Sequence, residues 1–188
     1  DLVAVGSEGE KLGSVVIPSG KVGLATVCSV LINGVLLKSG VPIESRFGGV
    51  LEVVDSKPRR FVAIISYTGT SVDPSDQYIR ARMTTVNEAA ATGNGRVLAN
   101  FREMPAPCRP VVEETIPLLK EAGIGGVCVL GNTSEPVCQI PIGLNRIGIV
   151  LLGGLNPLAA TVEAHIDVEN VGESGTIEYE RLVSFWEL

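Results

Sequence analysis

The apolar residues of this chain fall into short runs separated by turns rich in glycine and proline. The runs "GLATVCS" (23–29) and "GIVLLGG" (148–154) are almost unbroken, which predicts strands buried on both faces. The segment "RFVAIISY" (60–67) predicts a further strand. In "RVLANFREM" (96–104) apolar and polar residues alternate, and this period of two indicates a half-buried strand.

Capping residues predict where several helices begin. In "GTSVDPSDQYIRARM", Asp73 is expected to cap a short helix that opens with Pro74, because a side-chain oxygen followed by proline suits a helix start. By the same argument Asn156 is expected to be the N-cap of a helix opening with Pro157. An earlier helix is expected to end at Gly40, where positive φ is useful.

Three stretches between these elements are less regular. We expect "RPVVEETIPLLKEAG" (109–123) to be an amphipathic helix that Pro117 kinks or splits. The segment "MTTV" (83–86) is expected to start a strand, and "NEAAATGNG" (87–95) to be a loop. The middle of the chain therefore differs in pattern from its two ends.

The chain shows signs of an internal repeat. Residues 17–53 and 140–179 align with a two-residue gap that places Gly23 on Gly148, and a short apolar strand precedes each copy. Each copy is interpreted as β-β-α-β. We therefore predict a mixed α/β (α+β) fold with a pseudo-two-fold axis. It would be a single domain spanning residues 1–188, with residues 1–60 and 123–188 as its halves and 61–122 as a central strand and helix insertion.

Composition narrows the functional class. The chain has 188 residues, 45% of them apolar, and a net charge of -6. It is therefore expected to fold as one large domain or two small lobes, and not to bind nucleic acid itself. Its apolar runs are too short to span a bilayer, and no signal peptide is visible. We expect a cytoplasmic protein without membrane contact. The first residue, Asp1, suggests a fragment or a processed product.

The cysteines and the single histidine do not suggest catalysis. Cys28, Cys108, Cys128 and Cys138 follow no CxxC spacing, so buried, reduced thiols are favoured over a disulfide or a zinc site. A catalytic triad would need His165 as its base. That residue is expected near the end of a helix, where a structural role is favoured. We expect no enzyme activity, no metal and no cofactor.

Polar residues inside apolar surroundings indicate an anion site instead. They stand in "GTSVDP", "MTTV", "ANFRE" and "GGLNP", where a helix start and an arginine could hold a carboxylate. The alternative is structural: the threonines and the asparagine cap elements, the arginine pairs with Glu103 or another acid, and the two glycines allow close packing. The candidate ligand-binding residues are Thr70, Asp73, Thr84, Thr85, Asn100, Arg102, Arg146, Gly153, Gly154 and Asn156.

At these segments the sequence resembles the NrpR regulatory domain, the effector part of archaeal nitrogen-regulatory transcriptional repressors. The motifs "GLNRIGIVLLGGLNP" and "ANFRE" carry the resemblance most specifically. It implies an effector domain that senses 2-oxoglutarate, forms a homodimer and acts on DNA through a winged-helix domain that is not in this chain. A small-carboxylate-processing enzyme and a purely structural dimerisation domain remain the alternatives.

Overall fold

A computed structural model describes residues 2–171 and 175–188. Its centre is a five-stranded sheet with strand order β6-β5-β7-β9-β8, in which each neighbouring pair is antiparallel. The strands are β5 (Glu44–Val54), β6 (Lys57–Ser66), β7 (Gly95–Pro105), β8 (Val127–Leu130) and β9 (Arg146–Leu152). The predicted mixed α/β class is confirmed.

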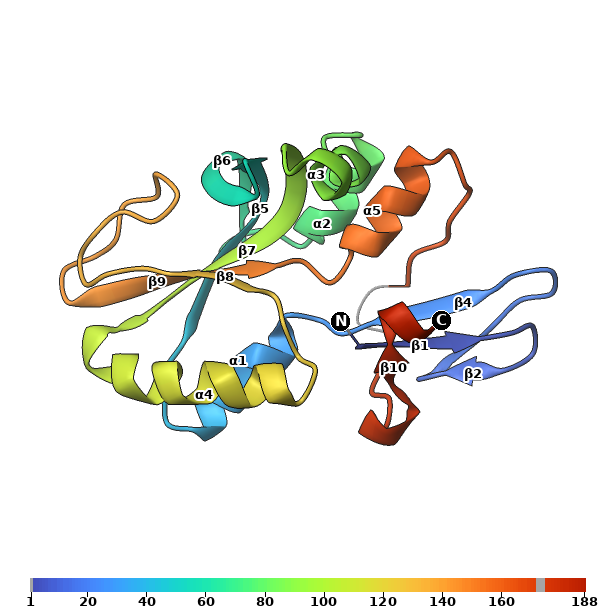
Figure 1. The fold of residues 1–188 in the computed structure, drawn as a ribbon, viewed down its shortest axis with the longest axis horizontal. Helices are drawn as coiled ribbons and strands as arrows, with labels where there is room; N and C mark the ends of the chain where they lie inside the picture. The colour runs from blue at the N-terminus through green and yellow to red at the C-terminus, as the bar shows by residue number, and fades with distance from the viewer. Residues whose placement is uncertain (1, 172–174) are drawn as a thin grey trace.

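A second, smaller sheet joins the two ends of the chain. It consists of β10 (Val183–Ser184), β1 (Leu2–Gly6) and β4 (Gly23–Thr26), again antiparallel. The hairpin of β2 (Lys11–Leu12) and β3 (Val15–Val16) lies against it. Because β1 and β10 pair directly, the N- and C-termini lie close together (Figure 1).

The helices fall into two groups, which lie on opposite sides of the view in Figure 1. One group is α1 (Val30–Lys38) and α4 (Arg109–Glu121), and the other is α2 (Pro74–Arg80), α3 (Val86–Thr92) and α5 (Asn156–Glu163). Short 3-10 helices cover Ala106–Cys108, Tyr179–Arg181 and Phe185–Glu187. No described helix has the length and apolar character needed to cross a bilayer.

One face of strand β7 packs against both helical groups. Side chains two residues apart on a strand share a face, so Leu98, Asn100, Arg102 and Met104 point the same way. Leu98 packs in a buried cluster with α2 and α5, whereas Met104 packs in another with α1 and α4. Asn100 and Arg102 therefore lie between two apolar clusters.

The other face of the sheet holds an aromatic cluster. Phe47 stacks on Phe101 with ring centroids 5.0 Å apart, and Phe61 meets Phe47 edge-on at 4.9 Å. Because both faces are covered, residues 97–104 are all buried. The expectation of a half-buried strand here was wrong: its polar residues are buried as well. The run 148–151 is buried as predicted, but β4 is only half-buried.

Three local predictions also need correction. "MTTV" starts no strand and "NEAAATGNG" is not a loop, because Val86–Thr92 forms helix α3 and ends at Gly93 with φ of 74°. Pro117 does not split α4, which is one helix from Arg109 to Glu121. A proline in a helix removes one backbone hydrogen bond, and burial of Val112 and Leu119 against the sheet stabilises the helix on both sides of that position.

The predicted repeat is matched in part. Strands β1 and β4 pair and lead into α1, and strands β8 and β9 pair and lead into α5. The final strand of the first unit is β5. The second unit was predicted to end with a strand as well. The described residues between α5 and β10 contain no strand, so that prediction is wrong for them; residues 172–174 lie outside the described part. The duplication itself stays a prediction.

Candidate functional site

A buried polar cluster fills the gap between the two helical groups. Its members come from separate elements that meet over one face of β5 and β7. They are Ser29 at the start of α1, Asn33 on α1, Ser45 on β5, Tyr67 after β6, and Asn100 and Arg102 on β7. Ser29, Asn100 and Arg102 are each less than one-tenth exposed.

Arg102 is the charged centre of this cluster. Its side chain is 2% exposed. Nη1 donates to the Ser45 hydroxyl, and Nη2 donates to the Ser29 hydroxyl over 3.1 Å. Nε is buried and has no hydrogen-bond partner, and no ion pair involves Arg102 among the residues that the structure describes.

The buried surroundings of Arg102 disfavour its charged form. Burial lowers the pKa of Arg102, and the neighbouring Tyr67 and Cys28, in their ionised forms, act in the opposite direction. A buried charge normally has an ionised partner, because desolvation costs several kcal/mol. The structural alternative, in which Arg102 pairs with Glu103 or another acid, is wrong for the described residues. None of their ion pairs includes Arg102. The side chains of Arg102 and Glu103 point to opposite faces of β7, and Glu103 pairs with Arg146.

The amide and hydroxyl groups around Arg102 form a continuous network. The Tyr67 hydroxyl donates to Asn100 Oδ1 over 2.5 Å, and Asn100 Nδ2 donates to Ser29 Oγ over 3.0 Å. Asn33 Nδ2 donates to Ser45 Oγ over 3.1 Å, whereas Asn33 Oδ1 is buried without a partner. The network therefore has one donor without a hydrogen-bond partner, Arg102 Nε, and one such acceptor, Asn33 Oδ1.

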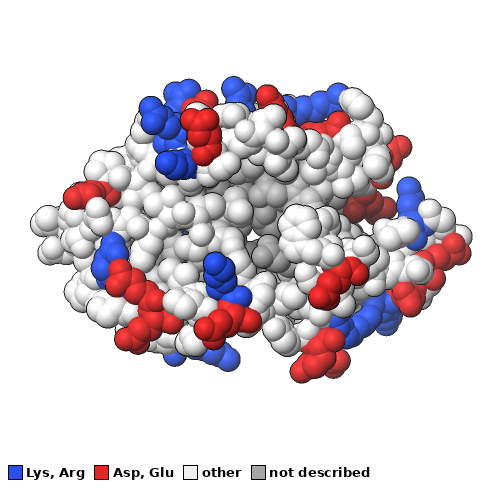
Figure 2. All heavy atoms as spheres, viewed as in Figure 1, with Lys and Arg blue, Asp and Glu red and all other residues white. Residues whose placement is uncertain are grey.

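A cavity of about 270 Å³ adjoins this network at Ser29. It lies where the small sheet, the start of α1, the start of α5 and the turn after α4 meet. Its lining includes Cys28, Ser29, Gly126, Gly153, Gly154, Asn156 and Trp186. In Figure 2 most of the Lys, Arg, Asp and Glu side chains of the described residues lie toward the rim of this face of the molecule, around a central hollow.

The glycine pair before α5 both lines this cavity and permits close packing. A Cβ on Gly154 would lie 2.6 Å from the Val27 carbonyl oxygen, and one on Gly153 would lie 3.0 Å from the Leu98 side chain. The Thr26 hydroxyl also donates to the Gly154 carbonyl oxygen over 2.7 Å. A side chain at Gly154 would therefore push the cavity walls apart.

Asn156 is not an N-cap as predicted. Leu155 holds that position, and Asn156 is the first residue of α5. Its Oδ1 accepts from the Leu98 N–H over 2.8 Å, and its Nδ2 donates to the carbonyl oxygens of Leu98 and Gly153. The side chain thus satisfies the backbone of β7 beyond the point where β9 stops pairing with it.

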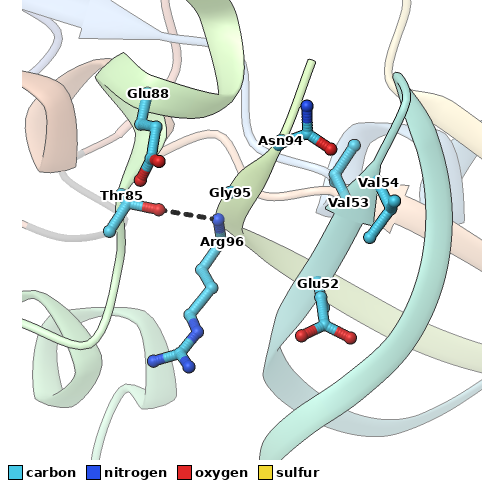
Figure 3. Close-up of a pocket in the computed structure, with 8 residues that line it drawn as sticks. All are labelled: Glu52, Val53, Val54, Thr85, Glu88, Asn94, Gly95 and Arg96. Atoms are coloured by element: carbon cyan, nitrogen blue, oxygen red, sulfur yellow. Dashed lines mark hydrogen bonds between the residues drawn. The ribbon is translucent and has the colours of Figure 1, made fainter. Parts of the chain in front are cut away.

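The predicted threonines lie away from this region. Thr84 donates to Glu163 at the far end of α5, and Thr85 accepts from the backbone of Arg96 in an open pocket of about 390 Å³ (Figure 3). Thr70 Oγ1 accepts from the backbone of a nearby turn. Asp73 caps α2 by accepting from Ser75, which confirms its predicted capping role.

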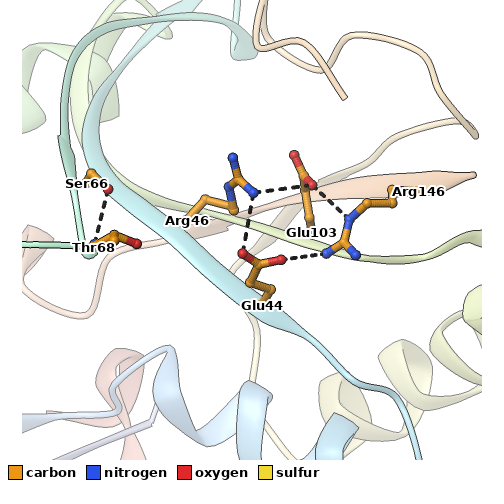
Figure 4. Close-up of polar contacts among 6 residues, drawn as sticks. All are labelled: Glu44, Arg46, Ser66, Thr68, Glu103 and Arg146. Atoms are coloured by element: carbon orange, nitrogen blue, oxygen red, sulfur yellow. Dashed lines mark hydrogen bonds and ion pairs between the residues drawn. The ribbon is translucent and has the colours of Figure 1, made fainter. Parts of the chain in front are cut away.

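Arg146 is held in an ion-pair cluster. It contacts Glu103 over 2.9 Å and Glu44 over 2.8 Å, and Arg46 completes the cluster (Figure 4). With two carboxylates already bound, this guanidinium has no free charge for a ligand. The structure thus brings together Asn100, Arg102, Gly153, Gly154 and Asn156, and leaves the other five candidates elsewhere.

Sequence reasoning missed the residues contributed by α1, β5 and β6. Ser29, Ser45 and Tyr67 carry no recognisable motif. One signal was present: the register that aligns Gly23 with Gly148 also aligns Cys28 and Ser29 with Gly153 and Gly154, and all four of these line the cavity.

The cysteines are free, as expected for reduced thiols, but Cys28 is exposed rather than buried and the other three are only partly buried. Within the described residues no group of three or more histidine, cysteine or acidic side chains could hold a metal ion. His165 follows the end of α5 with φ of 61°.

Comparisons with known proteins identify the family. Residues 1–184 match the model of the NrpR regulatory domains NRD1 and 2. The chain is 34% identical to the global nitrogen regulator NrpRI of Methanosarcina mazei, over 88% of this chain and 51% of that protein. It is 28% identical to the global nitrogen regulator NrpR of Methanocaldococcus jannaschii, over 89% of this chain and 29% of that protein.

The chain therefore spans about half of NrpRI and under a third of NrpR. Among solved structures, a nitrogen repressor-like protein from Methanococcus jannaschii superimposes with a TM-score of 0.79 and 27% identity, covering 98% of this chain and 73% of that one. These relatives are named as regulators, in agreement with the non-catalytic role expected from the sequence. The chain belongs to the family of NrpR regulatory domains.

Proposed function

We propose that this domain is the effector-binding and dimerisation domain of a nitrogen-responsive transcriptional repressor, and that its effector is 2-oxoglutarate. The names of its relatives support a role in nitrogen regulation. The geometry around Arg102 supports an anionic effector.

The observation that carries this proposal is the uncompensated charge of Arg102. A guanidinium that is 2% exposed, with a free Nε and no acidic partner among the described residues, is costly unless an anion joins it. A ligand carboxylate would supply that anion, since arginine and carboxylate form short, charge-assisted hydrogen bonds. One carboxylate of 2-oxoglutarate is assigned to Arg102 on this basis.

The rest of the ligand would occupy the adjoining cavity. The described residues that line this cavity include no lysine or arginine, so the second carboxylate would need uncharged donors. Backbone N–H groups at the starts of α1 and α5, which both border the cavity, suit an anion through the helix dipole. A keto oxygen would need one donor, and Asn100 or Ser29 could turn a polar hydrogen toward it.

Calorimetric titration with 2-oxoglutarate and glutarate in parallel tests the proposal. The two acids differ only by the keto oxygen, so selective binding of 2-oxoglutarate supports an effector role. A folded sample that binds neither acid refutes it and favours a purely structural dimerisation domain. Turnover of 2-oxoglutarate would instead identify an enzyme.

Dimerisation and DNA binding complete the proposal. Helix α1 exposes Val30, Leu31 and Leu37 by 42–54%, an apolar stripe that suits contact with a second copy. We expect a dimer by light scattering at micromolar protein; a monomer contradicts this part. Because the net charge is -6, the domain alone should not shift operator DNA, and a shift would show a DNA-binding surface within it.

Effector binding would act on DNA through an attached winged-helix domain. An effector changes operator affinity only by favouring one of two conformations. A tenfold change needs about 1.4 kcal/mol of coupling, which is less than one buried arginine–carboxylate contact can supply. Closure of the two helical groups around the cavity is the proposed conformational change.

A further inference from the structure

The open pocket of Figure 3 is separate from the effector cavity, and the two share no lining residue in the part of the chain that the structure describes. Its volume is about 390 Å³, and its walls come from the end of β5, the start of β7 and helix α3. The lining carries three charged side chains, which are Glu52, Glu88 and Arg96, beside the apolar Val53 and Val54. Charges of both signs therefore border one hollow.

Hydrogen bonds between backbone segments hold the walls of this pocket in place. The Arg96 N–H donates to the Thr85 hydroxyl, and the Thr85 N–H donates to the Arg96 carbonyl oxygen, each over 2.9 Å. The turn between β5 and β6 is attached as well, because the Ser56 N–H donates to the Gly93 carbonyl oxygen over 2.8 Å. A Cβ at Gly95 would lie 2.8 Å from the Thr85 carbonyl oxygen, so the missing side chain lets α3 pack close to β7.

The charged side chains of the pocket do not neutralise one another. Arg96 and Glu88 take part in none of the ion pairs formed by the described residues. Glu52 stands directly opposite Arg96 in the register of β5 and β7, but its carboxylate pairs with Arg60 over 2.8 Å. The Arg96 guanidinium and the Glu88 carboxylate are therefore both available to a ligand.

We propose that this pocket binds the zwitterionic end of an α-amino acid that has an uncharged side chain. The ligand carboxylate would accept from the Arg96 guanidinium, whose planar fork matches a carboxylate, and the ligand ammonium group would donate to Glu88. The Thr85 hydroxyl accepts from a backbone N–H and keeps its own hydrogen for the ligand carboxylate. Val54, which is 41% exposed, provides an apolar wall for the ligand side chain.

A ligand with both charges suits this pocket better than a simple anion or a simple amine. Glu52 and Glu88 would repel a dicarboxylate, and Arg96 would repel an amine. In an α-amino acid the two charged groups are attached to one carbon atom, so each can lie beside a charge of opposite sign. The proposal is independent of 2-oxoglutarate, which is proposed to bind in the other cavity.

Titration of the folded domain with L-leucine, followed by calorimetry and by backbone amide NMR, tests the site. The matched controls are 4-methylpentanoate, which lacks the ammonium group, and 3-methylbutylamine, which lacks the carboxylate. We expect saturable shifts of the Thr85, Gly95 and Arg96 amide signals with L-leucine and none with the two controls. No binding of L-leucine at millimolar concentration, or equally tight binding of 4-methylpentanoate, overturns the proposal.

Substitutions test the two side chains that are assigned to the ligand. Arg96→Met should weaken L-leucine binding about tenfold, because it removes charged hydrogen bonds, and Glu88→Gln should weaken it about two- to fivefold. Arg82→Met, which removes an exposed arginine outside the pocket, should leave the affinity unchanged. Arg96 and Glu88 are exposed, so the melting temperature should also be unchanged in their variants. Unchanged affinity in Arg96→Met overturns the proposal.

Saturation with 2-oxoglutarate separates the two proposed sites. If L-leucine still shifts the same amide signals in the saturated domain, the sites are distinct, as proposed. If 2-oxoglutarate instead displaces L-leucine from these residues, the pocket is a general anion site and the zwitterion proposal is wrong. If 2-oxoglutarate does not bind at all while L-leucine does, the effector proposal fails and the amino-acid site stands.

Discussion

Replacing Arg102 by methionine should remove effector binding without destabilising the fold. Methionine keeps an unbranched, apolar stem of similar course. The substitution leaves no new unpaired partner, because Ser29 Oγ still accepts from Asn100, and Ser45 Oγ still accepts from Asn33. The substitution removes two hydrogen bonds from a charged donor, which destabilises the protein. It also removes the cost of burying the charge, which stabilises it.

The two contributions are similar in size. Hydrogen bonds that involve a charged group contribute about 1.5–3 kcal/mol each, whereas burying an ion costs several kcal/mol. We therefore expect the free energy of unfolding to stay unchanged or to rise by up to about 3 kcal/mol. At about 2–4 °C per kcal/mol for a domain of this size, the melting temperature should rise or stay constant.

Chemical denaturation of the ligand-free protein provides the assay, with Arg146→Met as the matched control. Arg146 pairs with Glu103, whose side chain is 6% exposed, and its loss leaves Glu103 only Arg46 at 3.9 Å. Breaking a fully buried pair costs about 3–5 kcal/mol. This control should lose about 2–3 kcal/mol, because the Arg146 side chain is 30% exposed and Arg46 still lies near Glu103. A comparable loss in Arg102→Met would show that Arg102 is structural and refute the argument.

Three further substitutions test other parts of the structure. Asn156→Ala should cost about 2–3 kcal/mol by urea denaturation, because it leaves the buried Leu98 N–H unpaired; a loss under 1 kcal/mol would fit a simple cap instead. Gly154→Ala should lower the melting temperature and weaken effector binding, since its Cβ meets the Val27 carbonyl oxygen at 2.6 Å; unchanged binding would place the ligand elsewhere. Burial raises the pKa of Tyr78 from 10.0 to about 12, so its contribution is present below pH 10 and lost as the pH rises toward 12. Tyr78→Phe should therefore reduce the loss of stability in urea midpoints measured across this range, and an identical pH profile would contradict that.

The sequence predicted well wherever local chemistry decides structure. The cap at Asp73 and the buried run at 148–151 are as expected, because capping and apolar continuity are properties of neighbouring residues. "NEAAATGNG" was misread for the opposite reason. Helix α3 is stabilised at its start by Glu163, which lies far along the chain and accepts from the backbone of Val86 and Asn87.

The candidate site could be predicted only in part for a related reason. Asn100 and Arg102 stand out in an apolar strand, so a single segment reveals them. Whether an arginine is paired depends on which faces of which strands meet, and this separates Arg102 from Arg146. Ser29 and Ser45 become recognisable only when the sheet brings α1 over β7, and no pattern within one segment records that contact.

The most direct test of the central claim follows the Arg102 Nε–H group by NMR during titration with 2-oxoglutarate. This group is buried without a partner, so a carboxylate that binds it should shift its proton signal downfield as a charge-assisted hydrogen bond forms. We expect one arginine Nε–H signal, absent in Arg102→Met, to move with 2-oxoglutarate and to stay in place with glutarate. If 2-oxoglutarate binds by calorimetry while that signal stays in place, Arg102 does not hold the effector and the account is wrong.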